Sequence, residues 1–282
     1  MKVSNQKQSR WLYLILLLML LALVGFSIFP LLNSIVQVNQ SLTKTTSAPT
    51  SGFSDRQAQL EAQAQGYQLV LQREPDNQAA LRGLLDIRLQ QGDLKAAALP
   101  LERLAQLNPE QTDYWILLAQ TKQQVKDYQG AGAAYRTILA AHPWERKALE
   151  GIVNLFLEQE RPEAAISLVQ ETLKKATQAN IDRPNSVDMT ALQLLLAQVY
   201  ALQKRYPEAL AIYDQVIDAN PEDFRPVFSK AVVLQGQGKL AEAKLLFDRA
   251  LSLAPPEVKA QIRAMAPQLP ASETDPHKSA LP

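Results

Sequence analysis

A proline recurs along the chain at intervals of 34 residues. The regular series are Pro75, Pro109 and Pro143, and then Pro221 and Pro255. The interval of 78 between the two series equals two periods and ten residues, which predicts one repeat without its proline, at Thr177, and an insertion. A fixed period of this length indicates an array of similar units, in which each unit packs only against its neighbours.

Small and large side chains alternate at fixed positions within the period. The position twelve residues before each repeat end is always alanine: Ala97, Ala131, Ala165, Ala209 and Ala243. The position eight residues before the end is large: Leu101, Tyr135, Val169, Tyr213 and Phe247. Two packed helices per repeat require this alternation, because a small residue lets the backbones approach and a bulky one fills the gap a turn away. Each proline then marks the end of a second helix.

The period, the central alanine and the closing proline resemble the tetratricopeptide repeat (TPR) family. The resemblance implies an all-α solenoid of five helix-turn-helix repeats, with an insertion between the third and the fourth. The expected repeats are 76–109, 110–143, 144–177, 190–221 and 222–255, and the insertion is 178–189. We expect a flanking helix at 55–74, a capping helix at 256–269 and a disordered tail at 270–282. Pro100 predicts a kink in the second helix of the first repeat.

The first fifty residues lack the repeat pattern. A basic tail, residues 1–10, precedes a run of 22 uncharged residues, 11–32. As a helix that run is about 33 Å long, enough to cross a bilayer. We expect a transmembrane helix that acts as an uncleaved signal anchor, because the apolar core of a cleaved signal peptide, the alternative, is shorter. The Ser/Thr-rich residues 33–54 predict a flexible tether.

Charge is unevenly distributed along the chain. Lys2, Lys7 and Arg10 precede the predicted span and Lys44 follows it, which favours a cytoplasmic N-terminus and an extracytoplasmic solenoid. Residues 1–50 contain these four of the 29 basic residues and no acidic residue. The remainder of the chain therefore carries 25 basic and 28 acidic residues. A slightly acidic body does not attract phosphate backbones, and we expect no nucleic acid partner.

The composition argues against catalysis. The chain has no Cys and only two His, so thiolate and histidine metal sites have almost no ligands. Neither a Gly-rich phosphate loop nor a nucleophile elbow is present. We therefore expect no enzyme, no metal and no cofactor, and a protein or peptide as the partner, besides the lipid bilayer around residues 11–32.

The resemblance implies a binding groove lined by the first helix of each repeat. Two recurring positions supply the candidate residues: Arg82, Asp86, Ile116, Gln120, Glu150, Asn154, Leu194, Gln198 and Phe228. The polar ones are suited to the backbone of an extended peptide, and a hydrated wall without a ligand is the alternative. Asp86 and Leu117 are unsuited to a carboxylate clamp.

Trp144 is a possible hot spot or a packing residue between repeats, and the insertion is a second possible binding element.

Two functions fit this plan. The first is a membrane-anchored protein–protein interaction scaffold or assembly factor. In its architecture it resembles the TPR proteins of photosynthetic membrane and pigment biogenesis in cyanobacteria and plastids, including the Pitt type, which binds protochlorophyllide oxidoreductase. That resemblance implies a thylakoid or plasma membrane. The alternative is a periplasmic, chaperone-like TPR factor for exported proteins, which requires the solenoid on the outer side.

Overall fold

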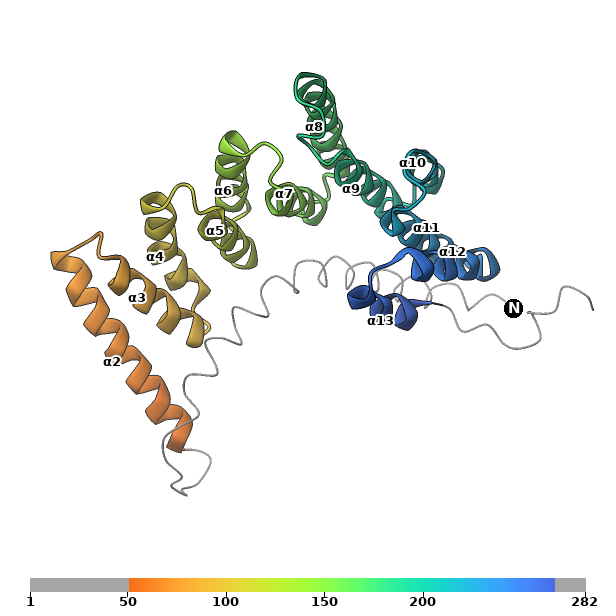
Figure 1. Cartoon of the computed structure of the whole chain (residues 1–282). Coiled ribbons are helices and arrows are strands. Elements are labelled where there is room, and N and C mark those ends of the chain that lie inside the picture. Colours follow the sequence, from red (N-terminus) through yellow and green to blue (C-terminus); the bar gives the residue numbers. More distant parts are fainter. Residues whose placement is uncertain (1–50, 267–282) are drawn as a thin grey trace, which may run out of the picture. The chain divides into compact units, whose positions relative to one another are not determined.

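The structure, a computed structural model, describes residues 51–266, with side chains from residue 55 onward. These residues form twelve α-helices and no strand, the all-α fold class expected (Figure 1). The contacts divide the chain into two compact units, whose described parts are 51–161 and 162–266. The predicted basic tail, transmembrane helix and C-terminal tail lie outside the described residues. Between 51 and 266 no helix has both the length and the apolar character to cross a membrane.

The unit 51–161 contains six helices. They are α2 (Ser51–Arg73), α3 (Gln78–Gln90), α4 (Leu94–Leu107), α5 (Thr112–Gln124), α6 (Tyr128–Ala141) and α7 (Arg146–Glu158). Each helix packs against the next in the sequence. Because α2 begins at Ser51, its first turn includes the last four residues of the segment assigned to the tether. Pro100 lies within α4, which runs on without interruption.

The unit 162–266 also contains six helices. They are α8 (Pro162–Asp182), α9 (Met189–Leu202), α10 (Tyr206–Ala219), α11 (Phe224–Gly236), α12 (Leu240–Leu253) and α13 (Pro256–Met265). The helices again pack in sequence order. In the predicted repeats α3, α5, α7, α9 and α11 are the first helices, and α4, α6, α8, α10 and α12 are the second helices.

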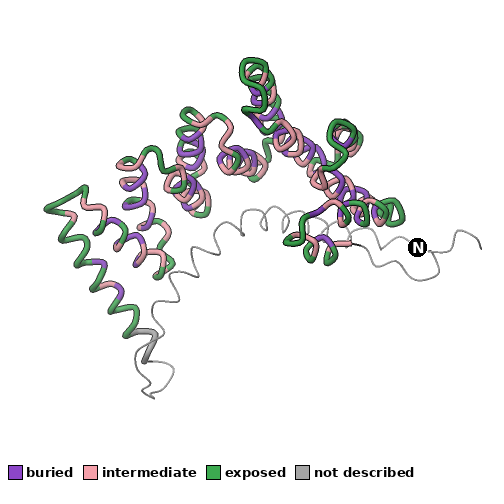
Figure 2. Tube along the Cα trace, in the orientation of Figure 1, coloured by how far each residue is buried: buried purple, intermediate pink, exposed green. Residues whose placement is uncertain are grey.

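The alanine column forms the tightest part of the core. All five alanines have 0% exposure. Figure 2 shows the buried residues in purple along the packed helices. Their large neighbours are equally buried, with exposures of 0% at Leu101 and Phe247, 1% at Tyr135 and 3% at Tyr213. The packing role predicted for both columns is thereby confirmed. The five prolines of the period lie in exposed turns after the helix ends, as the punctuation predicts.

The turn inside each repeat has a common geometry. Gly92, Lys126, Glu160, Lys204 and Gly238 all have a φ between 57° and 80°. Asp93 and Asp127 cap the helices that follow Gly92 and Lys126, each accepting a hydrogen bond from a backbone N–H three residues on. Glycine reaches this left-handed conformation without strain, whereas at Lys126 and Lys204 the packed flanking helices, α5 with α6 and α9 with α10, fix the turn.

The insertion is an ordered element. α8 has 21 residues, whereas α4, α6, α10 and α12 have 14 each. In the following loop, the Asn180 side chain donates to the Val187 carbonyl (3.0 Å) and accepts from the Val187 N–H (2.9 Å). Val187 is buried. These bonds hold the loop against the end of α8, so that α9 starts from a fixed point.

The alanine column predicts the effect of added bulk. Ala209→Leu should lower the free energy of unfolding by about 1 to 3 kcal/mol, because a fully packed site must shift to admit the larger side chain. Ala211→Leu is the matched control, since Ala211 is an exposed alanine of the same helix. Its effect should stay within about 0.5 kcal/mol. Chemical denaturation of both variants measures the difference, and equal losses would contradict the packing described.

Candidate functional site

The first helices form the inner side of each unit. α5 packs directly against α7, and α9 against α11. Within the described residues, the second helices α4 and α6 make no comparable contact, nor do α10 and α12. Helices that crowd together line the inside of a curved stack. A partner that follows the stack inside one unit therefore meets successive first helices.

Two amide side chains lie at equivalent places on neighbouring first helices. Gln120 is on α5 and Asn154 is on α7, and both are half-buried. Neither makes a side-chain hydrogen bond within the part of the chain that the structure describes. An amide carries two donor hydrogens and one acceptor oxygen, and buried polar groups are normally paired. These two side chains are thus open to a ligand. Gln198 on α9, in the other unit, is half-buried and unpaired in the same way.

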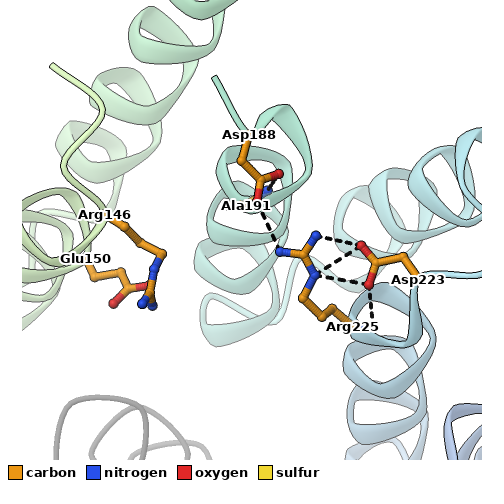
Figure 3. A network of polar contacts seen from close by, with 6 residues as sticks. All are labelled: Arg146, Glu150, Asp188, Ala191, Asp223 and Arg225. Carbon is orange, nitrogen blue, oxygen red and sulfur yellow. Dashed lines mark hydrogen bonds and ion pairs between the residues drawn. The ribbon is translucent and has the colours of Figure 1, made fainter. Parts of the chain in front are cut away.

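The charged candidates are already engaged with their own helices. Arg82 donates to Gln78 (2.8 Å), and Asp86 accepts from Gln90 (2.9 Å). Arg146 donates to Glu150 at 3.1 Å, the pair drawn on α7 in Figure 3. Only the charge of Glu150 meets an opposite charge, whereas Arg82 and Asp86 are bonded to neutral amides. The polar side chains of this face that make no hydrogen bond are the amides.

Glu150 is the one acid of the candidate face with a perturbed titration. Burial raises the pKa of its carboxyl, and the nearby Arg146 guanidinium opposes that rise in part. Only 23% of the Glu150 side chain is exposed. A carboxylate held in this way accepts hydrogen bonds but donates none. Glu150 therefore favours a ligand that brings N–H groups or a positive charge.

The apolar candidates do not all reach the surface. Ile116, expected to offer an apolar contact to a partner, is 6% exposed and packs in the core, so it has little surface for such a contact. Leu194 on α9 and Phe228 on α11 are half-buried. The Phe228 ring packs edge-on against Phe247, with the centroids 5.8 Å apart. Trp144, in the turn before α7, is half-buried as well.

Arg225 forms a network that the sequence pattern did not reveal. It donates to both carboxylate oxygens of Asp223 (2.7 to 3.0 Å) and to Asp188 (3.1 Å), as Figure 3 shows. Asp188 and Asp223 are the N-caps of α9 and α11, so Arg225 ties two first helices together. Its bonds to Asp223 raise the pKa of Arg225. Because two acids compensate its charge, Arg225 is not free to hold an anion.

A hollow of about 270 Å³ lies between α8, α9 and α10. It is lined by Leu173, Lys174, Thr177, Met189, Gln193, Leu196, Ile212 and Gln215. Sequence reasoning singled out the insertion but gave no signal for the hollow, because its lining comes from three helices. Between residues 51 and 266, no three His, Cys, Asp or Glu side chains gather as a metal site would require.

Comparisons with known proteins follow the repeat pattern. Residues 60–112, 116–181 and 173–224 match the family model described as Tetratricopeptide repeat. The chain is 29% identical over 216 residues to cellulose synthase operon protein C of Pseudomonas fluorescens (strain SBW25); the match covers 72% of this chain and 17% of that protein. It is 27% identical over 186 residues to protein SLOW GREEN 1, chloroplastic, of Arabidopsis thaliana, covering 66% and 58% respectively. The chain thus spans less than two thirds of either relative.

Among solved structures, yeast Tom70 is similar with a TM-score of 0.47 and 14% identity. The match covers 72% of this chain and 42% of that chain.

The raised pKa of Glu150 predicts a pH-dependent effect of Glu150→Gln. A carboxyl whose folded pKa lies above its unfolded value stabilises the fold at low pH, and that stability is lost as the pH rises through the folded pKa. The melting temperature of the variant relative to wild type should therefore be higher at about pH 7 than at about pH 4, below the unfolded pKa.

Glu110→Gln is the matched control for the loss of one carboxyl, because Glu110 is exposed in the turn before α5. Thermal unfolding at both pH values measures the difference. A Glu150→Gln shift that is the same at both would show that burial does not perturb this group.

Proposed function

This chain belongs to the tetratricopeptide repeat family, and from that membership we propose that it is an interaction scaffold that holds a partner protein against the inner faces of its first helices. The observation that carries the proposal is the unpaired, half-buried state of Gln120 and Asn154. Their polar atoms reach solvent, so a bound peptide could take the place of the water that hydrates them. The proposal contains no catalytic step.

The spacing of the amides fits an extended peptide. Packed helices lie about 8 to 10 Å apart, and an extended chain rises about 3.3 Å per residue. Amides on successive first helices would therefore meet every third residue of a bound strand. An amide donates to a backbone carbonyl and accepts from a backbone N–H, so this recognition depends little on the partner's side chains. Specificity would come from neighbours such as Glu150 and Trp144.

The membrane anchor belongs to the same proposal. It is supported by the uncharged run 11–32, which precedes the helical units. A scaffold held at a membrane raises the local concentration of whatever it binds. Anchor and binding face together describe an assembly factor that gathers a partner at the bilayer.

The membrane in question is proposed to be photosynthetic, in a cyanobacterium or plastid. The support is the similarity to SLOW GREEN 1, a protein described as chloroplastic. The excess of basic residues before the span instead supports the alternative, an extracytoplasmic chaperone-like factor. Protease protection of the membrane-bound chain separates the two orientations: cleavage from the outer side would contradict a cytoplasmic or stromal solenoid.

The binding face is tested by replacing Gln120, Asn154 and Gln198 together with Ala. The fold should be kept, because alanine favours helix and the three amides have no partners to lose. Affinity for the partner should fall at least about tenfold, since each lost hydrogen bond contributes about 0.5 to 1.5 kcal/mol. The measurement is quantitative capture from solubilised membranes, with the partner identified by mass spectrometry.

The matched control replaces Gln129 and Gln261 with Ala, two exposed glutamines on α6 and α13. It should capture as wild type does. Undiminished capture by the folded triple variant would exclude the amides and direct attention to the insertion and its hollow.

A further inference from the structure

α2 has the packing of a second helix. Tyr67 lies 68 residues, two periods, before Tyr135 of α6. A Cβ atom added at Gly83 of α3 would lie 2.3 Å from the Tyr67 ring, and one added at Gly151 of α7 would lie 2.3 Å from the Tyr135 ring. The two glycines are also two periods apart. α2 therefore packs on α3 in the way that α6 packs on α7.

Part of α2 is nevertheless uncovered. Tyr67 and Val70, here called the exposed pair, have exposures of 37% and 39%. Their equivalents on α6, Tyr135 and Ile138, have exposures of 1% and 2%. In the regular repeats each second helix also packs against the first helix that precedes it, as α6 does against α5. No first helix precedes α2 among the described residues, which accounts for the difference.

We propose that residues 29–41 of this chain, which lie outside the described residues, dock on the exposed pair as the first helix of an additional repeat. The segment has the 13-residue length of α3, α5 and α7. Its Leu32, Ile35 and Val36, the apolar triad, have the spacing i, i+3 and i+4. The same spacing occurs in the buried sets Leu81, Leu84 and Leu85 of α3, and Leu149, Ile152 and Val153 of α7.

The order of polarity along the two partners agrees with this docking. A docked first helix would form an αα-hairpin with α2 and so run antiparallel to it, and the first half of one would face the last half of the other. The apolar triad lies in the first half of the segment, and Asn39 and Gln40 lie in its second half. On α2 the exposed pair lies in the last half, and the exposed Gln59 and Gln63 lie nearer the start. In this arrangement the apolar triad faces the exposed pair, and the polar residues of the segment face those of α2.

Gln63 also sets how closely the segment approaches. It stands at the position that is a fully buried alanine in the five repeats. A long polar side chain prevents the close backbone approach that alanine permits. The docked segment therefore closes on the last half of α2, over the exposed pair, and stays farther away near Gln63.

The connecting chain is long enough. Relative to α6, which starts seven residues before Tyr135, α2 starts nine residues earlier, at Ser51. Nine helical residues extend it by about 13.5 Å. The connection 42–50 has nine residues and can span up to about 30 Å, which is enough to lead back along α2. Docking would shorten the predicted span to residues 11–28, which is about 27 Å as a helix. It would also reduce the expected tether, 33–54, to this connection and would hold the solenoid close to the predicted anchor.

The absence of cysteine from the chain gives a clean test in the full-length protein in detergent micelles. Val70→Cys is compared with Gln68→Cys, an exposed position on a different side of α2. We expect a maleimide to modify V70C at least about tenfold more slowly than Q68C, because a covered thiol reacts only when the cover opens. Equal rates would overturn the proposal.

A second pair of substitutions identifies the cover. Ile35→Gln with Val36→Gln leaves the predicted span 11–32 unchanged and removes two members of the apolar triad. In this background V70C should react within about twofold of Q68C, as an uncovered thiol does. Protection that survives these substitutions would overturn the proposal. If this protection of V70C disappears when the protein is diluted, a second copy of the chain covers the exposed pair. If the protection appears only in lipid vesicles, the bilayer covers it. Circular dichroism confirms that each variant is folded.

Discussion

The close approach of helices at the alanine column is the contact on which the rest of the structure depends. Each of these alanines is fully buried, and the large residue four positions on fills the adjoining space. The packing requires both residue sizes: a larger residue at the alanine position would separate the helices, and a smaller residue at the large position would leave a cavity. Because this contact recurs with the period, each helix pair is built in the same way and needs only its neighbours for stability.

Local construction explains where function can lie. An array in which each helix packs mainly against its neighbours in the sequence tolerates an insertion such as the end of α8, provided that the flanking helices keep their partners. The Asn180–Val187 bonds fix the loop that follows. Side chains that face the core, such as Ile116, are buried by packing contacts and are not accessible to a partner. Those on the inner sides of the first helices remain available at regular spacing. Unpaired amides at that spacing are better suited to a peptide backbone than to a small ligand.

The repeat could be predicted from the sequence because its proline and alanine columns have direct physical causes. The burial of Ile116 could not be predicted, because the exposure of a given position of the period depends on how the neighbouring helices pack around it. The left-handed turns at Lys126, Glu160 and Lys204 were also missed, since only glycine signals that conformation in a sequence. The Arg225 network joins residues 37 positions apart, and no period links them. The candidate binding residues themselves remain predictions.

The central claim is that a partner lies along the inner face of the first helices. Site-specific photocrosslinking tests it most directly, with a benzophenone side chain placed at Gln120 on α5, at Asn154 on α7 or at the exposed Gln129 on α6. Illumination of intact membranes should give one adduct of defined mass from position 154, the same partner from position 120, and none from position 129. Adducts only from position 129, or equal adducts from all three, would contradict the claim.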